Sequence, residues 1–206
     1  MQDESRLWRA GTLDGNSGGA YNTYCILNAG DTNNMKVTGK QKNSRMCVIC
    51  GMDNPFGLKA PFYNMEDGSV MTKFMYREEH QSYPGRVHGG LIGAMLDELG
   101  FRACWVKDDS VWGVTMNLET LYRKPVPYGE ELIGRGKVER QTARFAQVKS
   151  EIMTMDGTIL ASATGKFLLM GLNQIAQNAE VHEELHLMVE DDVAEINFGS
   201  GDGHEE

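Results

Sequence analysis

The chain of 206 residues has no apolar run long enough to cross a bilayer, and its first thirty residues lack the apolar core of a signal peptide. These absences predict a cytoplasmic protein without a membrane partner. Cysteine is also scarce, with four residues in the chain. Because no secretion signal is present, we expect reduced thiols rather than a disulfide framework at Cys25, Cys47, Cys50 and Cys104.

Basic residues are missing from the last part of the chain. Residues 167–206 hold ten acidic residues and no Lys or Arg, whereas residues 1–166 hold nineteen acidic and twenty basic residues. The formal net charge of −9 therefore belongs to the C-terminal tail, and the remainder is close to neutral. Since a nucleic-acid-binding surface has to be basic, the sequence predicts no nucleic-acid partner.

Composition divides the chain into three parts. Residues 1–34 are polar, rich in Gly and Asn and without periodicity, so we expect a flexible N-terminal extension. Residues 35–170 read as one domain of ordinary size. Residues 171–206 read as an acidic, partly helical C-terminal extension.

The periodicity of the central part predicts one helix among strands. Asp67-Gly68 and Asp156-Gly157 are dipeptides typical of hairpins, and a helical period runs from about His88 to Ala103. The expected strands are residues 58–66, 69–76, 112–122, 131–141, 144–154 and 158–170. Two strands, a long helix and four strands predict an α+β fold, in which one antiparallel sheet wraps around a long central helix.

The expected helix opens with His88-Gly89-Gly90. A helix N-terminus offers unpaired N–H groups and a partial positive charge, so these glycines suit a developing oxyanion. A carboxylate on the same helix, Asp97, supplies a base or nucleophile for the same carbonyl. One face of the helix is apolar, and the other holds Gly90, Gly93, Asp97 and Gly100. The alternative is close helix packing along the glycines, with Asp97 merely solvated.

These residues carry a resemblance to a known family. The His88-Gly89-Gly90 triplet, Asp97 and the strand TMNLETLYRKPVP (residues 115–127), in this order, resemble the hot-dog-fold acyl-CoA thioesterases of the PaaI-like branch. The upstream strings CVICGMDNPFGLKAPFY (residues 47–63) and HQSYPGRVHGG (residues 80–90) are similar to members of that branch too. The resemblance covers roughly residues 35–170, and its specificity comes from the ordered combination of motifs.

The resemblance implies a role for each matching residue. Asp97 matches the carboxylate that acts as general base or nucleophile, and Gly89 matches the residue whose N–H polarises the thioester carbonyl, with Gly90 beside it. His88 matches the motif histidine that helps to shape the site, and Thr115 matches a Ser/Thr that contacts the carboxylate or its water. The family also implies a homodimer or homotetramer with active sites at the subunit interface, and an acyl-CoA substrate without a further cofactor.

Other candidate residues concern substrate binding. Some relatives carry Asn six positions before the motif histidine, and this chain has Ser82 there, with Gln81 beside it. Arg123 and Lys124 are expected contacts of the CoA phosphates, with solvated loop charges as the alternative. Phe101, one turn beyond the carboxylate, is a candidate for the acyl pocket or for ordinary core.

Three rival motifs are present. Cys47-x-x-Cys50 has half of a zinc-site spacing, but no second matched pair completes four ligands, so we expect no metal. His182-Glu183-Glu184-Leu185-His186 spells the pattern HExxH, and its acidic context favours a solvated helix face. Residues 15–19 spell G-x-S-x-G without the strand and helix that a nucleophile elbow needs, which favours a flexible linker.

The sequence thus predicts hydrolysis of acyl-CoA thioesters to free acid and CoA. The main alternative is a non-catalytic protein that binds acyl-CoA or another acyl ligand on the same fold. A hydratase ranks third, since it needs a carboxylate and a histidine at the β-carbon of the substrate, and His80 or His88 would have to serve.

Overall fold

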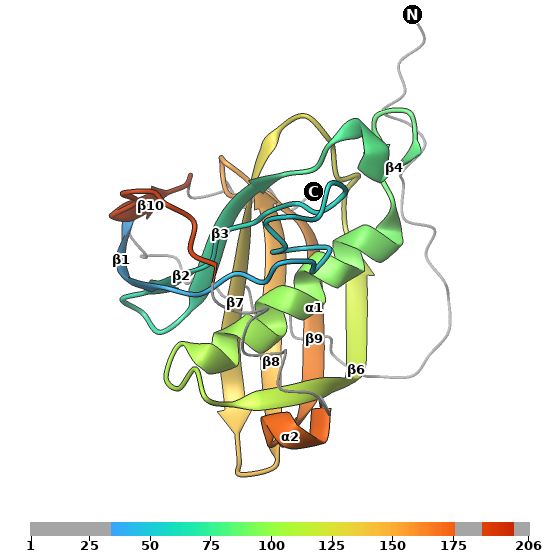
Figure 1. Cartoon of the computed structure of the whole chain (residues 1–206). Helices are drawn as coiled ribbons and strands as arrows, with labels where there is room; N and C mark the ends of the chain where they lie inside the picture. The colour runs from blue at the N-terminus through green and yellow to red at the C-terminus, as the bar shows by residue number, and fades with distance from the viewer. Residues whose placement is uncertain (1–33, 176–186, 200–206) are drawn as a thin grey trace, which may run out of the picture.

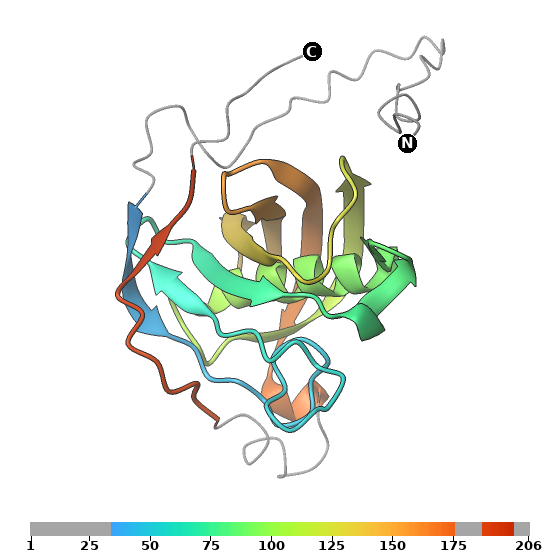
Figure 2. The same cartoon turned by 90° about the horizontal axis from the view of Figure 1, so that it is seen from above.

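The computed structural model describes residues 34–175 and 187–199, and within them one sheet wraps around one long helix (Figure 1). The eight-stranded sheet has the order β10-β1-β2-β3-β7-β8-β9-β6, and every neighbouring pair is antiparallel. Its strands are β1 (Asn34–Lys40), β2 (Tyr63–Met65), β3 (Val70–Met75), β6 (Trp112–Tyr122), β7 (Glu131–Gln141), β8 (Phe145–Thr154), β9 (Ile159–Met170) and β10 (Glu195–Asn197). Helix α1 (Gly89–Trp105) crosses its concave face, as the view from above shows (Figure 2).

Smaller elements fill the connections. A short 3₁₀ turn (Glu78–His80) leads into the hairpin of β4 (Gln81–Tyr83) and β5 (Arg86–Val87), which directly precedes α1. Helix α2 (Leu172–Ile175) follows β9. No helix of the described residues is both long enough and apolar enough to span a bilayer.

The predicted α+β arrangement is confirmed, with one boundary wrong. The strand expected over residues 58–66 shortens to β2, because the N–H groups of Leu58 and Ala60 bond to carbonyls of the preceding loop, at Val48 and Ile49. Residues 41–62 therefore form a loop held by its own backbone. Both predicted hairpin turns are present, with Gly68 at φ 77° and Gly157 at φ 87°.

The apolar face of α1 packs on the sheet at short range. Its inward residues are fully or nearly fully buried: Ile92, Met95, Leu96, Leu99 and Ala103. A Cβ atom on Gly136 of β7 would lie 2.3 Å from the Leu99 carbonyl oxygen, and one on Gly134 would lie 2.7 Å from the Leu99 side chain. Glycine in the sheet thus permits the close approach of α1, and this fixes the height of the helix above the strands.

Residues 187–199 run back along the first strand. β10 pairs with β1, where Asn34, Met35 and Lys36 oppose Asn197, Ile196 and Glu195. Ile196 and Phe198 are buried in an apolar cluster with Met35, Met65 and other side chains outside the helix-facing core. The acidic end of the chain therefore contributes core residues, whereas the proposed domain boundaries stay a prediction.

Candidate active site

The N-terminus of α1 presents one free amide. His88 is the N-cap with extended backbone, and its Nδ1 accepts a hydrogen bond of 2.9 Å from the Gly90 N–H. The amides of the next two residues bond to the His88 carbonyl. Among the described residues the Gly89 N–H has no acceptor, so Gly89, and not Gly90, is the donor left for a ligand.

Tyr122, the last residue of β6, holds this turn from the other side. Its hydroxyl donates a hydrogen bond of 2.9 Å to the Gly89 carbonyl. Sequence reasoning missed Tyr122. The only signal was a tyrosine at the end of a strand, which does not say what its hydroxyl will reach.

Asp97 lies two turns further along α1 and is half-buried. The Thr115 hydroxyl of β6 donates a hydrogen bond of 2.7 Å to its Oδ1, which is the contact that the resemblance implied. Burial raises the pKa of Asp97, the negative charge of Glu98 raises it too, and the bond from Thr115 opposes both effects. A carboxylate whose pKa is raised is a stronger base at neutral pH, and it is oriented here by a single hydroxyl.

The glycine-bearing face of α1 serves two purposes. A Cβ on Gly100 would lie 2.8 Å from Val148 and 3.1 Å from Phe167, so this glycine allows close packing on the sheet. A Cβ on Gly93 would meet only the Tyr122 hydroxyl, at 3.8 Å. The packing alternative is therefore right for Gly100, whereas the N-terminal part of the face borders the site.

Gly89 and Asp97 of one chain are too far apart to act on one carbonyl. They are eight residues apart on α1, and a rise of about 1.5 Å per residue separates them by about 12 Å along the axis. A reacting carbonyl needs its oxyanion donor and its base each about 3 Å away. Within one chain the two groups therefore cannot serve one carbonyl, so the predicted convergence on the same carbon needs Gly89 and Asp97 of different chains.

The strand beside both groups is an open edge. β6 pairs with β9 on one side and with no other strand of residues 34–175 and 187–199 on the other. Large apolar side chains are exposed along it: Val114, Met116, Leu121 and Tyr122. A long edge strand with exposed apolar residues is a surface on which a second chain can pair.

The remaining predicted residues fall at different places. Gln81 and Ser82 are exposed on β4, where Gln81 pairs with Val87 directly before the N-cap. Arg123 and Lys124 are exposed just beyond Tyr122, at the Gly89 end of the site, and their amides bond to the Leu160 carbonyl. Phe101 packs against Phe167 and Trp105, with ring centroids 5.6 and 5.8 Å away, which favours the core alternative.

His80 is not available as a base. Its Nδ1 accepts a 2.9 Å bond from the Arg77 amide, so Nε2 carries the proton that bonds the Phe56 carbonyl at 2.8 Å. Both ring nitrogens of this buried histidine are occupied, and the hydratase alternative loses one of its two candidate histidines.

Thiols form a second cluster on another side of α1, beside Glu98. A hydrogen bond from Cys50 is the main cause that lowers the pKa of Cys47, to about 7, while burial and Glu98 raise it. The same pairing and burial raise the pKa of the Cys50 thiol far above its usual range.

The HExxH and G-x-S-x-G motifs and Cys25 lie outside the described residues.

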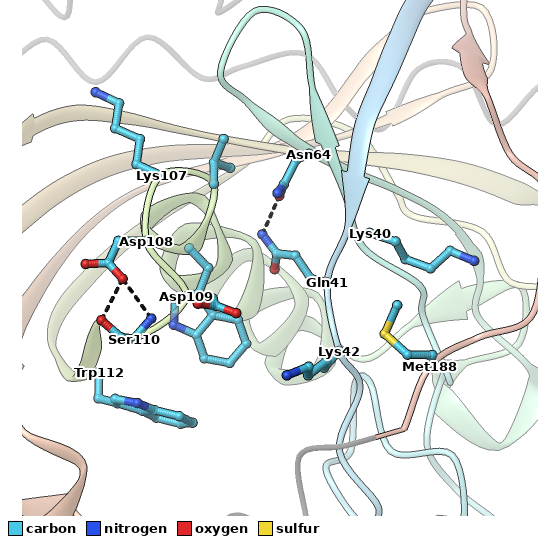
Figure 3. A pocket seen from close by; sticks show the side chains of 12 residues that line it. Lys40, Gln41, Lys42, Asn64, Lys107, Asp108, Asp109, Ser110, Trp112 and Met188 are labelled. Atoms are coloured by element: carbon cyan, nitrogen blue, oxygen red, sulfur yellow. Dashed lines mark hydrogen bonds between the residues drawn. The ribbon is translucent and has the colours of Figure 1, made fainter.

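A cavity of about 570 Å³ lies at the C-terminal end of α1 (Figure 3). Trp105 and Trp112 line it together with Lys40, Lys42 and Lys107. Neither Gly89 nor Asp97 borders it. The cavity is therefore separate from the candidate active site in this chain.

One antiparallel sheet that wraps around one long helix is the hot-dog fold. A family model of the thioesterase superfamily matches residues 84–161, which span both groups. A protein of Saccharolobus solfataricus assigned as an esterase is 30% identical over 107 residues, 52% of this chain and 76% of that protein. Human acyl-coenzyme A thioesterase 13 is 25% identical over 104 residues, 50% of this chain and 69% of that protein.

Solved structures agree on the fold. A crystal structure of a thioesterase superfamily protein superposes with a TM-score of 0.55 at 30% identity, covering 60% of this chain and 63% of that one. The PaaI protein of E. coli has the same fold, with a TM-score of 0.50 at 18% identity over 55% of this chain and 81% of that one. The chain belongs to the thioesterase superfamily and has its hot-dog fold, and the class of reaction of this superfamily is thioester hydrolysis.

Proposed function

We propose that this protein hydrolyses acyl-CoA thioesters in active sites shared by two copies of the chain. The observation that carries the proposal is the half-buried Asp97, held at 2.7 Å by Thr115 on the same edge of the fold where α1 leaves the Gly89 N–H free. The human relative, which is an acyl-coenzyme A thioesterase, supports the substrate class.

The chemistry follows from these two groups. The Gly89 N–H donates to the thioester carbonyl oxygen and stabilises the negative charge that develops there. Asp97 removes a proton from the attacking water, or attacks first to give a mixed anhydride that water then opens. The C–S bond breaks, the acyl group leaves as the free acid, and the CoA thiolate takes up a proton. Thr115 orients the carboxylate throughout.

The separation of about 12 Å along α1 requires a second chain. Pairing of two β6 edges about a two-fold axis covers the exposed apolar residues of that strand and turns the two helices antiparallel. Gly89 of one copy then faces Asp97 of the other, and each dimer contains two equivalent sites. A homodimer is the smallest assembly that meets this requirement, and a homotetramer built from such dimers meets it too.

The charged end of the substrate fits the same edge. Arg123 and Lys124 follow Tyr122 directly and are exposed, so they are placed to bind CoA phosphates beside the Gly89 end of the site. Gln81 and Ser82 of the neighbouring hairpin are the polar groups available for the attacking water.

Complementation between two inactive variants tests the shared site. Gly89→Pro deletes the amide N–H and Asp97→Asn deletes the base, so each variant alone is expected to be nearly inactive. Coexpressed in equal amounts, they form mixed dimers with one intact site, and about a quarter of the wild-type activity per chain returns. Coexpression of Asp97→Asn with the Asp97→Asn/Gly89→Pro double variant is the control, because no arrangement of that pair restores a site.

Free thiol release from a panel of acyl-CoAs is the assay. Absence of recovery in mixed dimers that have been verified by mass contradicts the shared site. Tight binding of acyl-CoA by the wild-type protein without turnover contradicts hydrolysis and favours the binding-protein alternative.

A further inference from the structure

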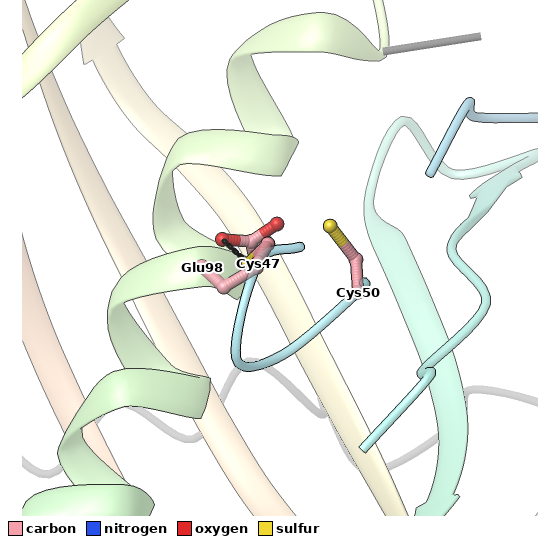
Figure 4. Close-up of side chains that lie close together, drawn as sticks. All are labelled: Cys47, Cys50 and Glu98. Atoms are coloured by element: carbon pink, nitrogen blue, oxygen red, sulfur yellow. Dashed lines mark hydrogen bonds between the residues drawn. The ribbon is translucent and has the colours of Figure 1, made fainter. Parts of the chain in front are cut away.

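Three potential metal ligands meet on the side of α1 that the proposed reaction does not use. Cys47 and Cys50 come from the loop of residues 41–62, and Glu98 comes from the middle of α1 (Figure 4). The two sulfurs and one carboxylate oxygen all lie within 4.8 Å of one another. Cys50 is 2% exposed, whereas Cys47 and Glu98 are partly open to solvent.

The loop forms a tight turn around Cys47. The Ile49 N–H donates to Cys47 Sγ at 3.3 Å, and the Gly51 N–H bonds back to the Cys47 carbonyl at 2.9 Å. A Cβ on Gly51 would lie 2.3 Å from that carbonyl oxygen, so only glycine fits after the second cysteine. This turn brings both sulfurs to one side, and an amide directed at the first sulfur favours the thiolate that metals bind.

The two carboxylate oxygens of Glu98 point to different partners, one to Arg102 and the other to Cys47. Its Oε1 accepts a 2.9 Å bond from Arg102 Nε, while its Oε2 lies 3.9 Å from Cys47 Sγ. Tetrahedral zinc with bonds of about 2.3 Å to sulfur and about 2.1 Å to oxygen places those ligand atoms about 3.6 Å apart. The observed separation is therefore within a few tenths of an ångström of a shared ion, and Arg102 supplies the outer hydrogen bond that a ligating carboxylate needs.

The charges around the cluster also balance with a divalent ion. Two thiolates and the Glu98 carboxylate carry a formal charge of about −3, and a divalent cation and the buried Arg102 guanidinium carry about +3. Ser44 Oγ, 3.3 Å from Cys50 Sγ, adds a hydroxyl that can donate to the second thiolate.

We propose that Cys47, Cys50 and Glu98 bind one Zn²⁺ ion, with a water molecule as the fourth ligand. Two Zn–S bonds form as the two thiols release their protons to solvent, and no electrons are transferred. Soft thiolates select zinc over the hard divalent ions. The ion fastens the loop of residues 41–62 to α1 at the residue after Asp97, and this function is independent of thioester hydrolysis.

Metal content of the full-length, reduced protein tests the proposal. We expect about one zinc per chain in the wild type, and loss of zinc in Cys47→Ser and Cys50→Ser. The matched control is Cys104→Ser, which removes another buried thiol outside the cluster and keeps the zinc. Glu98→Gln retains an oxygen that can accept from Arg102 but loses the charged ligand, and its zinc affinity is expected to fall.

A spectroscopic probe covers the case in which a cysteine variant fails to fold. Co²⁺ added to the metal-free wild-type protein is expected to give a thiolate-to-cobalt charge-transfer band that zinc then removes. Wild-type protein with both thiols reduced, no zinc and no such band overturns the proposal. So does a Cys47–Cys50 disulfide that persists in protein prepared with zinc present, since it would make the pair a redox site instead.

Discussion

Replacing Gly89 by proline removes one proposed catalytic hydrogen bond and little else. Gly89 is the first helical residue after the N-cap, which is the position where proline is favoured. His88 before it has φ −64° and ψ 130°, a conformation that a residue preceding proline adopts without strain. The Gly89 N–H bonds to no described residue, so the substitution breaks no hydrogen bond of the fold.

The expected loss follows from that single donor. Removal of one oxyanion donor costs about 10²- to 10³-fold in kcat, or about 2.7 to 4 kcal/mol of transition-state stabilisation. Thermal stability is expected to stay the same or rise slightly, because proline restricts the unfolded chain. Gly89→Ala is the matched control, since it keeps the N–H and its Cβ meets the Tyr122 hydroxyl at an ordinary 3.6 Å.

Steady-state kinetics of acyl-CoA hydrolysis, read as free thiol, distinguish the two variants. Gly89→Ala is expected to stay within a few-fold of the wild type. Equal kcat values for a folded Gly89→Pro variant and the wild type would refute the assignment of this amide as the oxyanion donor. A loss of the same size in both variants would refute it as well, because alanine leaves the donor in place.

Further predictions concern charge and packing. Because the pKa of Asp97 is raised, the folded state keeps a proton that the unfolded state releases. The free energy of unfolding of the wild type is therefore expected to fall, relative to that of Asp97→Asn, as the pH rises from 3.8 to the folded-state pKa. Urea midpoints of the two proteins that stay parallel across that range would contradict the shift. Arg123→Ala and Lys124→Ala are each expected to raise KM for acyl-CoA roughly 2- to 5-fold with kcat unchanged, and this increase is expected to be smaller at high salt. A KM that changes neither on substitution nor with salt would contradict contact with the CoA phosphates. Gly136→Ala is expected to destabilise by about 1 to 3 kcal/mol in urea unfolding, because the added Cβ meets the Leu99 carbonyl; unchanged stability would show that α1 can move away from the sheet.

Local patterns predict most of the sheet and the helix. The bounds predicted for β6 and β7 coincide with those observed, although burial does not alternate along either strand: β6 has no fully buried residue, and the buried residues of β7 are consecutive. Strands β1 and β10 were not expected. They pair with each other across about 160 residues, and β1 also pairs with β2 across the loop of residues 41–62. No local period records pairings between segments that far apart in the chain.

The site residues were predictable, but not their arrangement. The His88-Gly89-Gly90 triplet and Asp97 stand out because glycines and an acid interrupt an apolar helix. Which of the two glycine amides is free depends on the His88 ring, and which hydroxyl supports the turn depends on Tyr122 across the fold. Neither hydrogen bond has a signature in the order of residues.

Two adjacent acidic residues of α1, Asp97 and Glu98, contact different parts of the fold. Asp97 faces the open edge at β6, where Thr115 holds it, and Glu98, about 100° further around the axis, faces Arg102 and the cysteine loop. A contact that fixes Glu98 therefore also fixes the rotation of α1 about its own axis at the turn that carries Asp97. The base of the proposed reaction is positioned from both sides of the helix, by a hydroxyl on the sheet and by the loop of residues 41–62, although only the hydroxyl touches it.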